Sequence, residues 1–408
     1  MGDPQGGGRH NGRRPVRRAV RVLHTSDWHV GKRIGRYDRS DEYRDVIDEV
    51  VGIAEDEAVD LVLHSGDLFD RPLPPIDALN IAFDGLVALS DGGERPVVVI
   101  AGNHDSPGFF DALAPFLRTV NVHLVGAIKR PDDGGVLQLD TAAGPAVVSA
   151  FPFLREGRSF EVWEPPEEHY KKYADRLRAI SEAYSAHAAA LAGTDAVTFL
   201  VAHFLVGGAR VHGHGAPRGE RELHMGEAYA ATAEAIPPGP QYVAMGHIHA
   251  PQPVPGAKVP AEYAGSLLEL DFGEAGEEKR VVVVDVEPGL PAAVRSVPLG
   301  RGRRLLRPRG PWDEILGMDG VHDSYLDLTV ETAGPDPGLA ERAFDEFDHL
   351  VKVRADYPRV EAERPAAEYR SLTEQYSDYY AATNEAEAPD DLIEAFTSVL
   401  EEVVGASG

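Results

Sequence analysis

Short apolar runs alternate with amphipathic segments along most of the chain. The runs within residues 21–25, 60–67 and 95–105 are bounded by turn residues, which is typical of buried strands. Residues 41–59 and 75–91 instead carry apolar side chains at helical spacing, so one face of each segment can pack on a sheet. Further strands are predicted within residues 146–154, 196–204, 242–245 and 280–286, and a long helix at about 166–191. This order of elements predicts an α/β layered sandwich.

The composition changes at about residues 296–312, where Arg, Gly and Pro concentrate, and this change predicts a domain boundary. We therefore expect a main domain at residues 20–300 and a small α+β domain at residues 301–365. The small domain is predicted to place strands at 324–330 and 351–357 around a helix at about 339–350. The basic, Gly-rich residues 1–19 are expected to form a disordered tail.

Residues 366–408 are predicted to be a helical segment whose last helix has one apolar stripe. The stripe consists of Leu392, Ile393, Phe396, Val399, Leu400 and Val403. Acidic residues precede it, which is favourable at the start of a helix. The stripe could pack on its own domain or dock a partner protein, and both interpretations stay open.

Composition limits the compartment and the chemistry. The 408 residues include no cysteine, so a metal site must use nitrogen and oxygen ligands, and this absence fits the cytoplasm. We expect no membrane partner, because no apolar stretch could cross a bilayer and the N-terminus lacks the apolar region of a secretory signal. The net charge of −27 opposes nucleic-acid binding unless positive charge is segregated, as in the basic clusters at 9–21, 32–39 and 300–309.

Five of the predicted strands end in side chains that can bind metals. These ends are Ser26-Asp27-Trp28-His29, Gly66-Asp67-Leu68-Phe69-Asp70, Gly102-Asn103-His104-Asp105, His203, and Gly246-His247-Ile248-His249. In α/β sheets, binding sites collect just beyond the carboxyl ends of the strands. Each string alone is a weak signal, but the ordered set DxH, GDxxD, GNHD, H and GHxH is specific. It predicts one site to which all five ends contribute.

This ordered set resembles that of the calcineurin-like metallophosphoesterases. The longer stretches LHTSDWHVGK, GDLFDRPLPP, GNHDS and VAMGHIHAPQ resemble the bacterial SbcD nucleases, counterparts of the nuclease subunit of double-strand-break repair complexes. The resemblance covers residues 20–300 well and continues more loosely to the last helix. It implies a four-layer β-sandwich flanked by helices, a small α+β capping domain that faces DNA, and a C-terminal helix that docks a partner.

The resemblance also implies two metal ions, Mn²⁺ in the first place, with Mg²⁺ or another divalent ion as the alternative. The first ion would be held by Asp27, His29, Asp67 and His249, and the second by Asp67, Asn103, His203 and His247, with Asp67 bridging. Carboxylate and imidazole ligands suit such ions. Water activated by the ions would attack the phosphorus in line.

Residues next to these ligands are given supporting roles by the same resemblance. His104 would contact the phosphate and protonate or stabilise the leaving oxygen, and Asp105 would orient it. Asp70 is expected to support the site from behind the ligands, with a simple turn cap as the alternative. A tryptophan such as Trp28 more often serves packing than chemistry, but its place between two ligands predicts a wall of the site.

The basic residues Lys32, Arg33 and Arg36 follow the first motif and would either contact the DNA backbone or form a solvated loop. Other histidines are set aside as ligands. His24 and His64 are expected in the core or just behind the site, and His212, His214 and His224 away from it.

The implied function is that of a DNA nuclease subunit that acts with an SbcC-type ATPase, within a heterotetramer that contains a homodimer. It would cut DNA ends and hairpins as a 3′–5′ exonuclease and endonuclease in repair, recombination and replication. No Walker A string is present, so ATP would be used by the partner. The alternative is a phosphomonoesterase or protein phosphatase, since Arg71 follows Asp70 as in the phosphatase string GDxxDRG, although Pro72 and Asp105 depart from that pattern.

Overall fold

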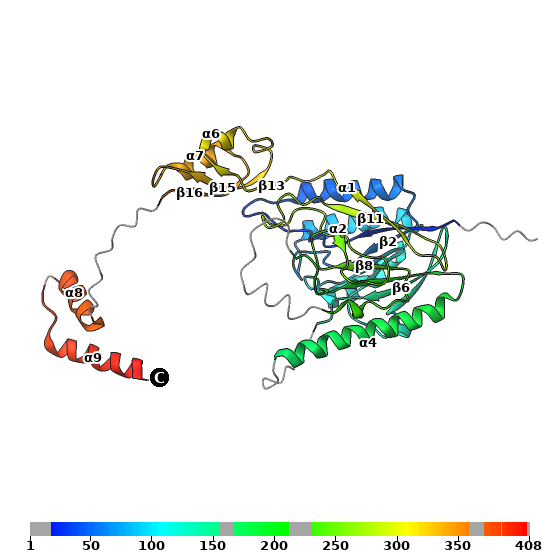
Figure 1. Ribbon diagram of the computed structural model, residues 1–408, viewed down its shortest axis with the longest axis horizontal. Coiled ribbons are helices and arrows are strands. Elements are labelled where there is room, and N and C mark those ends of the chain that lie inside the picture. The colour runs from blue at the N-terminus through cyan, green and yellow to red at the C-terminus, as the bar shows by residue number, and fades with distance from the viewer. Residues whose placement is uncertain (1–17, 156–165, 212–230, 359–370, 385, 406–408) are drawn as a thin grey trace, which may run out of the picture. The chain divides into compact units, whose positions relative to one another are not determined.

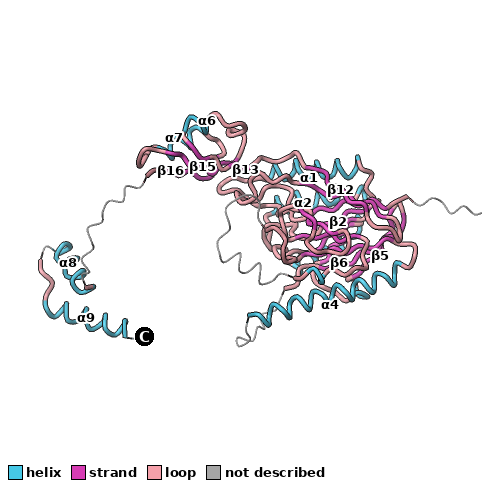
Figure 2. Tube along the Cα trace, in the orientation of Figure 1, coloured by secondary structure: helices cyan, strands magenta, loops and turns pink. Residues whose placement is uncertain are grey.

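The computed structural model describes residues 18–155, 166–211, 231–358, 371–384 and 386–405 (Figure 1). In the main domain the strands gather at the centre and helices lie outside them (Figure 2). Residues 1–17 of the predicted tail lie outside the described part of the chain. Among the described helices, none combines the length and apolar character that crossing a bilayer requires.

The first sheet has the strand order β12-β11-β1-β2-β3-β4. Its strands are β1 (Val20–Thr25), β2 (Leu61–His64), β3 (Val97–Ile100), β4 (Val122–Val125), β11 (Arg280–Val286) and β12 (Ala293–Pro298). β1 to β4 are parallel, so their carboxyl ends meet at one edge. The connections between them contain α1 (Ser40–Asp56), α2 (Ile76–Leu89) and α3 (Pro107–Leu117).

The second sheet has the strand order β5-β6-β7-β8-β10-β9. Its strands are β5 (Val136–Thr141), β6 (Gly144–Phe151), β7 (Val197–His203), β8 (Tyr242–Gly246), β9 (Gln252–Pro253) and β10 (Ala261–Tyr263). The helix α4 (Pro166–Ala192) precedes β7. Short 3-10 turns occur at η1 (Asp91–Gly93), η2 (Arg118–Val120), η3 (Pro131–Asp133) and η4 (Ala233–Ala235). Because β6, β7 and β8 are parallel, a second set of carboxyl ends meets at one edge.

Alternating side chains decide which layer each strand contacts. Leu23 of β1 packs with the helices α1 and α2, whereas Val22 points to the other face and packs against the second sheet. In the second sheet, Val201 faces the first sheet and Leu200 packs in the core beneath α4. The layers are therefore helices, sheet, sheet and helix, which confirms the predicted four-layer metallophosphoesterase sandwich.

The small domain has its own sheet and its own core. Its strands are β13 (Leu305–Leu306), β14 (Arg309–Gly310), β15 (Tyr325–Glu331) and β16 (Leu350–Asp356), and its helices are α6 (Trp312–Leu316) and α7 (Leu339–Glu346). Leu326 and Leu328 of β15 pack against Ala343 of α7 in this core. The predicted helix at 339–350 was too long, because α7 ends at Glu346 and Leu350 already begins β16.

A buried polar junction joins the small domain to α1. The guanidinium of Arg39 is almost fully buried and bonds to Oε2 of Glu42 at 2.9 Å. The hydroxyl of Tyr325 donates to Oε1 of Glu42 at 2.7 Å, and the N–H of Leu305 donates to Glu269 at 2.6 Å. These contacts join β13 and β15 to the main domain, and the charged groups Arg39, Glu42 and Glu269 each have a hydrogen-bond partner at this junction.

The C-terminal residues form a separate compact unit. It contains α8 (Leu372–Asn384) and α9 (Asp390–Gly405), so the C-terminal element comprises two helices instead of the one that the predicted fold contained. The rings of Tyr376 and Phe396 stack with centroids 4.1 Å apart and hold the two helices together. No residue of α8 is buried.

Candidate metal centre and active site

Polar residues at five strand ends lie together where the two sheets meet. In chain order they are Asp27 and His29 after β1, Asp67 after β2, Asn103 after β3, His203 at the end of β7, and His247 and His249 after β8. Parallel strands bring these ends to one edge in each sheet. The contacts described below join residues of the first sheet to residues of the second, so all five ends contribute to one cluster.

Glycine precedes several of these residues because the backbones approach closely. A Cβ atom on Gly102 would lie 2.1 Å from Oδ1 of Asp67, and a Cβ atom on Gly246 would lie 2.1 Å from the carbonyl oxygen of Ser65. Side chains do not tolerate such contacts. The glycines in the GNHD and GHxH strings are therefore needed for packing around the cluster.

Four residues of the cluster have left-handed backbone conformations that side chains rarely adopt. They are Asp27 (φ 50°), His29 (φ 48°), Asp67 (φ 53°) and His247 (φ 93°). Each such residue costs on the order of 1–3 kcal/mol, so the surrounding structure must hold it. Hydrogen bonds do so: the N–H of Asp27 donates to the carbonyl of Gly66 at 2.9 Å, and that of His29 to the carbonyl of Asp67 at 3.0 Å.

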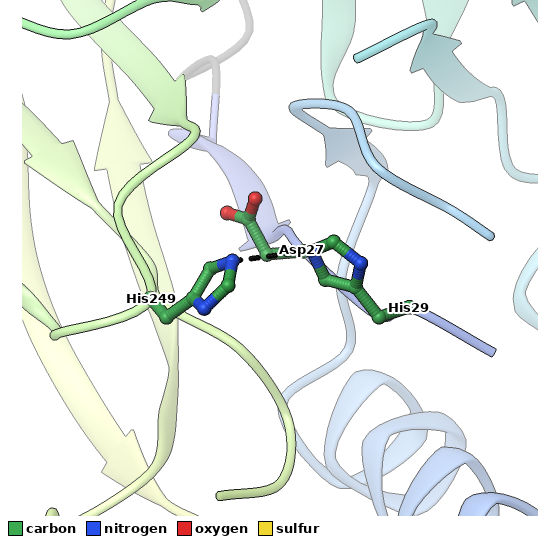
Figure 3. A group of neighbouring side chains, drawn as sticks. All are labelled: Asp27, His29 and His249. Carbon is green, nitrogen blue, oxygen red and sulfur yellow. Dashed lines mark hydrogen bonds between the residues drawn. The ribbon is translucent and has the colours of Figure 1, made fainter. Parts of the chain in front are cut away.

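Asp27, His29 and His249 form one group of candidate ligands (Figure 3). One nitrogen or oxygen atom from each residue lies within 4.8 Å of the others. The two imidazoles approach from opposite sides, with Nε2 of His29 3.1 Å from Nε2 of His249. These three residues come from both sheets.

Asp67, Asn103, His203 and His247 form a second group. Nε2 of His203 lies 3.3 Å from Oδ2 of Asp67 and 3.0 Å from Oδ1 of Asn103. Nδ1 of His247 lies 2.9 Å from the same amide oxygen. Since Nε2 of His29 also lies 3.5 Å from Oδ2 of Asp67, this carboxylate lies between the two groups, where a bridging ligand must lie.

The donor atoms fit divalent cations. Nδ1 of His203 lies 2.7 Å from the carbonyl of Ser65, so a neutral ring carries its proton there and turns the lone pair of Nε2 toward the oxygen of Asn103. In this neutral form two lone pairs would face each other, and a cation between them would remove the repulsion. Although burial disfavours the charged imidazole, the Asp67 carboxylate raises the pKa of His203 to about 9. Positive charge is therefore favoured at this position, and a divalent ion would supply it.

His104 lies beside the cluster with its ring held in one orientation. Its backbone N–H donates to Oδ1 of Asp67 at 2.8 Å, and its Nδ1 lies 2.8 Å from the carbonyl oxygen of Asp70. A carbonyl only accepts, so Nδ1 carries the proton and Nε2 is the ring atom that can reach a substrate. The ring packs edge-on against His29, with centroids 4.7 Å apart.

Three relatives show which family this chain belongs to. Residues 20–251 match the calcineurin-like phosphoesterase family. The chain is 31% identical to the SbcD component of the nuclease SbcCD from Bacillus subtilis, over 91% of this chain and 95% of the relative. It is 31% identical to the same component from Rhodobacter capsulatus, over 84% and 82%, and 28% identical to that from Escherichia coli K12, over 68% and 68%.

The chain belongs to the SbcD nucleases of the calcineurin-like phosphoesterase family. It is therefore a metal-dependent phosphodiesterase, and the cluster of carboxylate, imidazole and amide groups is the part of the molecule suited to that chemistry.

Asp105 differs from its predicted role in this nuclease. Its fully buried carboxylate accepts the N–H groups of Leu68 at 3.2 Å, Phe69 at 3.0 Å and Gly102 at 2.9 Å, whereas Nδ1 of His104 is bonded to Asp70. Burial and the nearby charge of Asp67 raise the pKa of Asp105 to about 7. Asp105 thus fixes the loops that carry the ligands and does not orient the His104 ring.

Asp70 lies directly behind a candidate ligand. Its Oδ1 is 4.0 Å from Nδ1 of His29 and 3.1 Å from Nζ of Lys32. Nδ1 of His29 is buried and has no hydrogen-bond partner in the described part of the chain. The Asp70 carboxylate is therefore close to this ring, and its supporting role behind the ligands stays a prediction.

Trp28 belongs to the core instead of forming a wall of the site. Its side chain is fully buried among residues of α1 and α2, and its indole N–H donates to Oγ1 of Thr25 at 2.7 Å.

The histidine His24 is likewise buried, with Nδ1 2.8 Å from the hydroxyl of Tyr242 and Nε2 2.8 Å from Oγ of Ser65. His64 is buried with its ring edge-on against Trp28. His212, His214 and His224 lie outside the described residues.

The three basic residues after the first motif point to different partners. Lys32 pairs with Asp70, which places its charge next to the cluster. Arg33 pairs with Asp38 at 3.5 Å, and the Arg36 guanidinium lies 4.9 Å from the ring centroid of Phe344 in the small domain. Arg36 is therefore at the junction of the two domains.

The sequence motifs missed Phe153, Arg155 and Glu274. The Phe153 ring stacks on His247 with centroids 6.2 Å apart, and the Arg155 guanidinium donates to the carbonyl of Asn103 at 2.9 Å. Both follow β6, which is parallel to β7, so the available signal was a further strand end at the same edge. Glu274 lies in a loop and contacts His249, and no sequence pattern marks it.

Proposed function

We propose that this chain is the nuclease subunit of an SbcCD-type complex that hydrolyses phosphodiesters at DNA ends and hairpins with two Mn²⁺ ions, as a 3′–5′ exonuclease and endonuclease. The proposal rests on the convergence of seven nitrogen- and oxygen-bearing side chains from two sheets, next to His104, whose Nδ1 is bonded to the carbonyl of Asp70. The relatives are named as the SbcD components of SbcCD nucleases, which supports a role in a complex with an SbcC-type partner. In this proposal the partner would use ATP.

The seven side chains would hold the ions in two groups that share Asp67. Bound ions would neutralise phosphate oxygens and lower the pKa of an attacking water. Asn103 contributes a neutral oxygen, which limits the negative charge that a phosphate substrate meets. Mn²⁺ suits this mixture of carboxylate, amide and imidazole donors, and Mg²⁺ is the alternative.

His104 would act on the leaving oxygen. With Nδ1 bonded to the carbonyl of Asp70, the imidazolium form would carry its second proton on Nε2, and it could donate that proton as the P–O bond breaks. The bond between the His104 N–H and Asp67 keeps the ring at a fixed distance from the bridging carboxylate. No covalent enzyme intermediate is needed.

DNA would be bound by local positive charge despite the net charge of −27. Lys32 pairs with Asp70 beside the cluster and Arg36 lies against Phe344 of the small domain. Together with Arg33 they would contact the backbone. Arg307, Arg309 and Arg354 line a groove of about 750 Å³ at the sheet of the small domain, where they pair with Asp327 and Asp356. These arginines support the proposal that residues 301–365 form a capping domain that faces DNA.

Exposed apolar side chains support the proposed protein partners. Leu372, Tyr379 and Val399 in the C-terminal unit are 54%, 66% and 59% exposed, so its apolar surface is open to the docking of an SbcC-type subunit. Ile76 of α2 and Phe116 of α3 are 74% and 72% exposed, which favours a homodimer face on these helices. A heterotetramer would use both surfaces.

A cleavage assay tests the proposal. Purified protein with Mn²⁺ is given linear duplex DNA with blocked ends, hairpin DNA and para-nitrophenyl phosphate, with and without the ATPase partner. We expect DNA cleavage that His104→Ala abolishes without loss of bound metal, whereas His187→Ala on α4 serves as the matched control and keeps it. Fast turnover of the phosphomonoester with DNA left intact would instead establish a phosphatase. Loss of metal in His104→Ala would show that His104 is a ligand.

A further inference from the structure

A buried pair of charged residues lies directly behind His249. Oε1 of Glu274 is 2.8 Å from Nδ1 of His249, and Oε2 of Glu274 is 2.8 Å from Nζ of Lys279. Glu274 and Lys279 are only 5% and 6% exposed. The backbone N–H of Leu270 also donates to Oε2 at 3.0 Å, so both carboxylate oxygens have partners.

Lys279 holds this arrangement from its other side. Its ammonium group has three protons, and it has three acceptors: Glu274 at 2.8 Å, Glu277 at 2.9 Å and the backbone carbonyl of His249 at 3.2 Å. His249 is therefore held at its ring by Glu274 and at its backbone by Lys279. A buried ammonium without such partners would be costly, which explains why the set occurs together.

We infer that Glu274 is a positioning residue for metal binding, which fixes the His249 ring with Nδ1 protonated and Nε2 turned toward the ion site. A carboxylate only accepts hydrogen bonds, so it selects this tautomer, and it also raises the basicity of the ring as a ligand. Lys279 fixes the carboxylate in turn. The inference rests on the proposed function, because it takes His249 to be a ligand.

A comparison with His203 shows why His249 needs such a partner. The His203 side chain is fully buried, and the backbone carbonyl of Ser65 holds its Nδ1 at 2.7 Å. The His249 side chain is 18% exposed and its Nδ1 is held by a side chain instead. The orientation of His249 therefore depends on a group that a substitution can change without altering the backbone.

The test is Glu274→Gln, which keeps the shape of the side chain but removes its charge. Metal-free protein is titrated with Mn²⁺ in the absence of DNA, by calorimetry and by the electron paramagnetic resonance of free Mn²⁺. We expect one of two sites to bind about 10- to 100-fold more weakly. Glu269→Gln is the matched control, because Glu269 is a buried acid of the same loop that bonds to Gly276 and Leu305 instead of a candidate ligand. Its Mn²⁺ affinities should equal those of the wild type.

Two further measurements separate the possible failures. His249→Ala should lose one site; if both sites persist, the ligand assignment in the proposed function is wrong. If His249→Ala loses a site but Glu274→Gln binds Mn²⁺ like the wild type, even with a lowered melting temperature, Glu274 is only structural and the inference fails. If Glu274→Gln does not fold, the ¹⁵N chemical shifts of the histidine rings are measured in wild-type protein loaded with Zn²⁺. The inference requires that His249 carries its proton on Nδ1 and binds the metal through Nε2. The opposite tautomer overturns it.

Discussion

Gly102 lies just after β3 and faces the carboxylate that both ligand groups share. A Cβ atom there would lie 2.1 Å from Oδ1 of Asp67 and 2.4 Å from its backbone nitrogen. Cβ atoms essentially never come closer than 3.0 Å to such neighbours, so Gly102→Ala must displace Asp67 by at least about 0.9 Å. The displaced atoms include backbone, so a rotation of the side chain alone cannot relieve the contact.

This displacement should lower the rate of cleavage strongly and the free energy of unfolding moderately. A shift of about 1 Å in a catalytic group can reduce the rate on the order of 100-fold, and overpacking costs about 1–3 kcal/mol in stability. Gly102→Ala should therefore fold, bind Mn²⁺ more weakly and cleave DNA at about one hundredth of the wild-type rate or less. The assays are Mn²⁺ titration, hairpin cleavage and urea denaturation.

The matched control is Gly108→Ala at the start of α3. An added Cβ on Gly108 meets no atom within 4 Å, so this variant should keep full activity and gain about 0.5–1 kcal/mol of helix stability. Wild-type metal affinity and cleavage in Gly102→Ala would refute the reasoning. That result would mean that the loop after β3 moves aside, so that the Asp67 carboxylate keeps its position.

Three further predictions concern stability. Chelation of divalent ions should lower the melting temperature, because a ligand at 100 times its Kd stabilises the folded protein by about 2.7 kcal/mol. Equal melting temperatures with and without Mn²⁺ would contradict a metal site. Tyr325→Phe should lower the free energy of unfolding by about 1 kcal/mol in urea titrations, because it removes the hydrogen bond to Glu42. Burial would raise the pKa of Glu42, but Arg39 holds this pKa below its usual value. The ionised carboxylate therefore stabilises the fold above about pH 4.5, and this stabilisation is lost as the pH falls. Glu42→Gln should accordingly lose less stability in acid than the wild type.

The sequence predicted the elements that carry the site because their signals are local. β1 was expected at about 21–25 and is observed at Val20–Thr25, and α4 was expected at about 166–191 and is observed at Pro166–Ala192. Apolar runs that end in a glycine mark buried strands whatever their neighbours are. The motif residues were therefore placed at strand ends, and the parallel pairing of the strands brought them together.

The remaining features depend on contacts between distant parts of the chain. Glu274 reaches the cluster from a loop through tertiary packing, so no local pattern identifies it. The role of Asp105 was misjudged for the same reason: its neighbour in sequence is His104, but its hydrogen bonds go to the loop after β2. Sequence adjacency suggested a contact that the direction of the side chain does not allow.

The orientation of three histidine rings is likewise set by a partner far away in the sequence. Nδ1 of His203 is held by the carbonyl of Ser65, Nδ1 of His104 by that of Asp70, and Nδ1 of His249 by Glu274. In each case the partner fixes one ring nitrogen, so the other is directed by the fold and not by the ion. Together with the left-handed residues that surrounding hydrogen bonds maintain, these partners prepare the donor positions in advance. The cost of ordering the ligands is therefore met during folding, which leaves more of the binding free energy available for metal affinity.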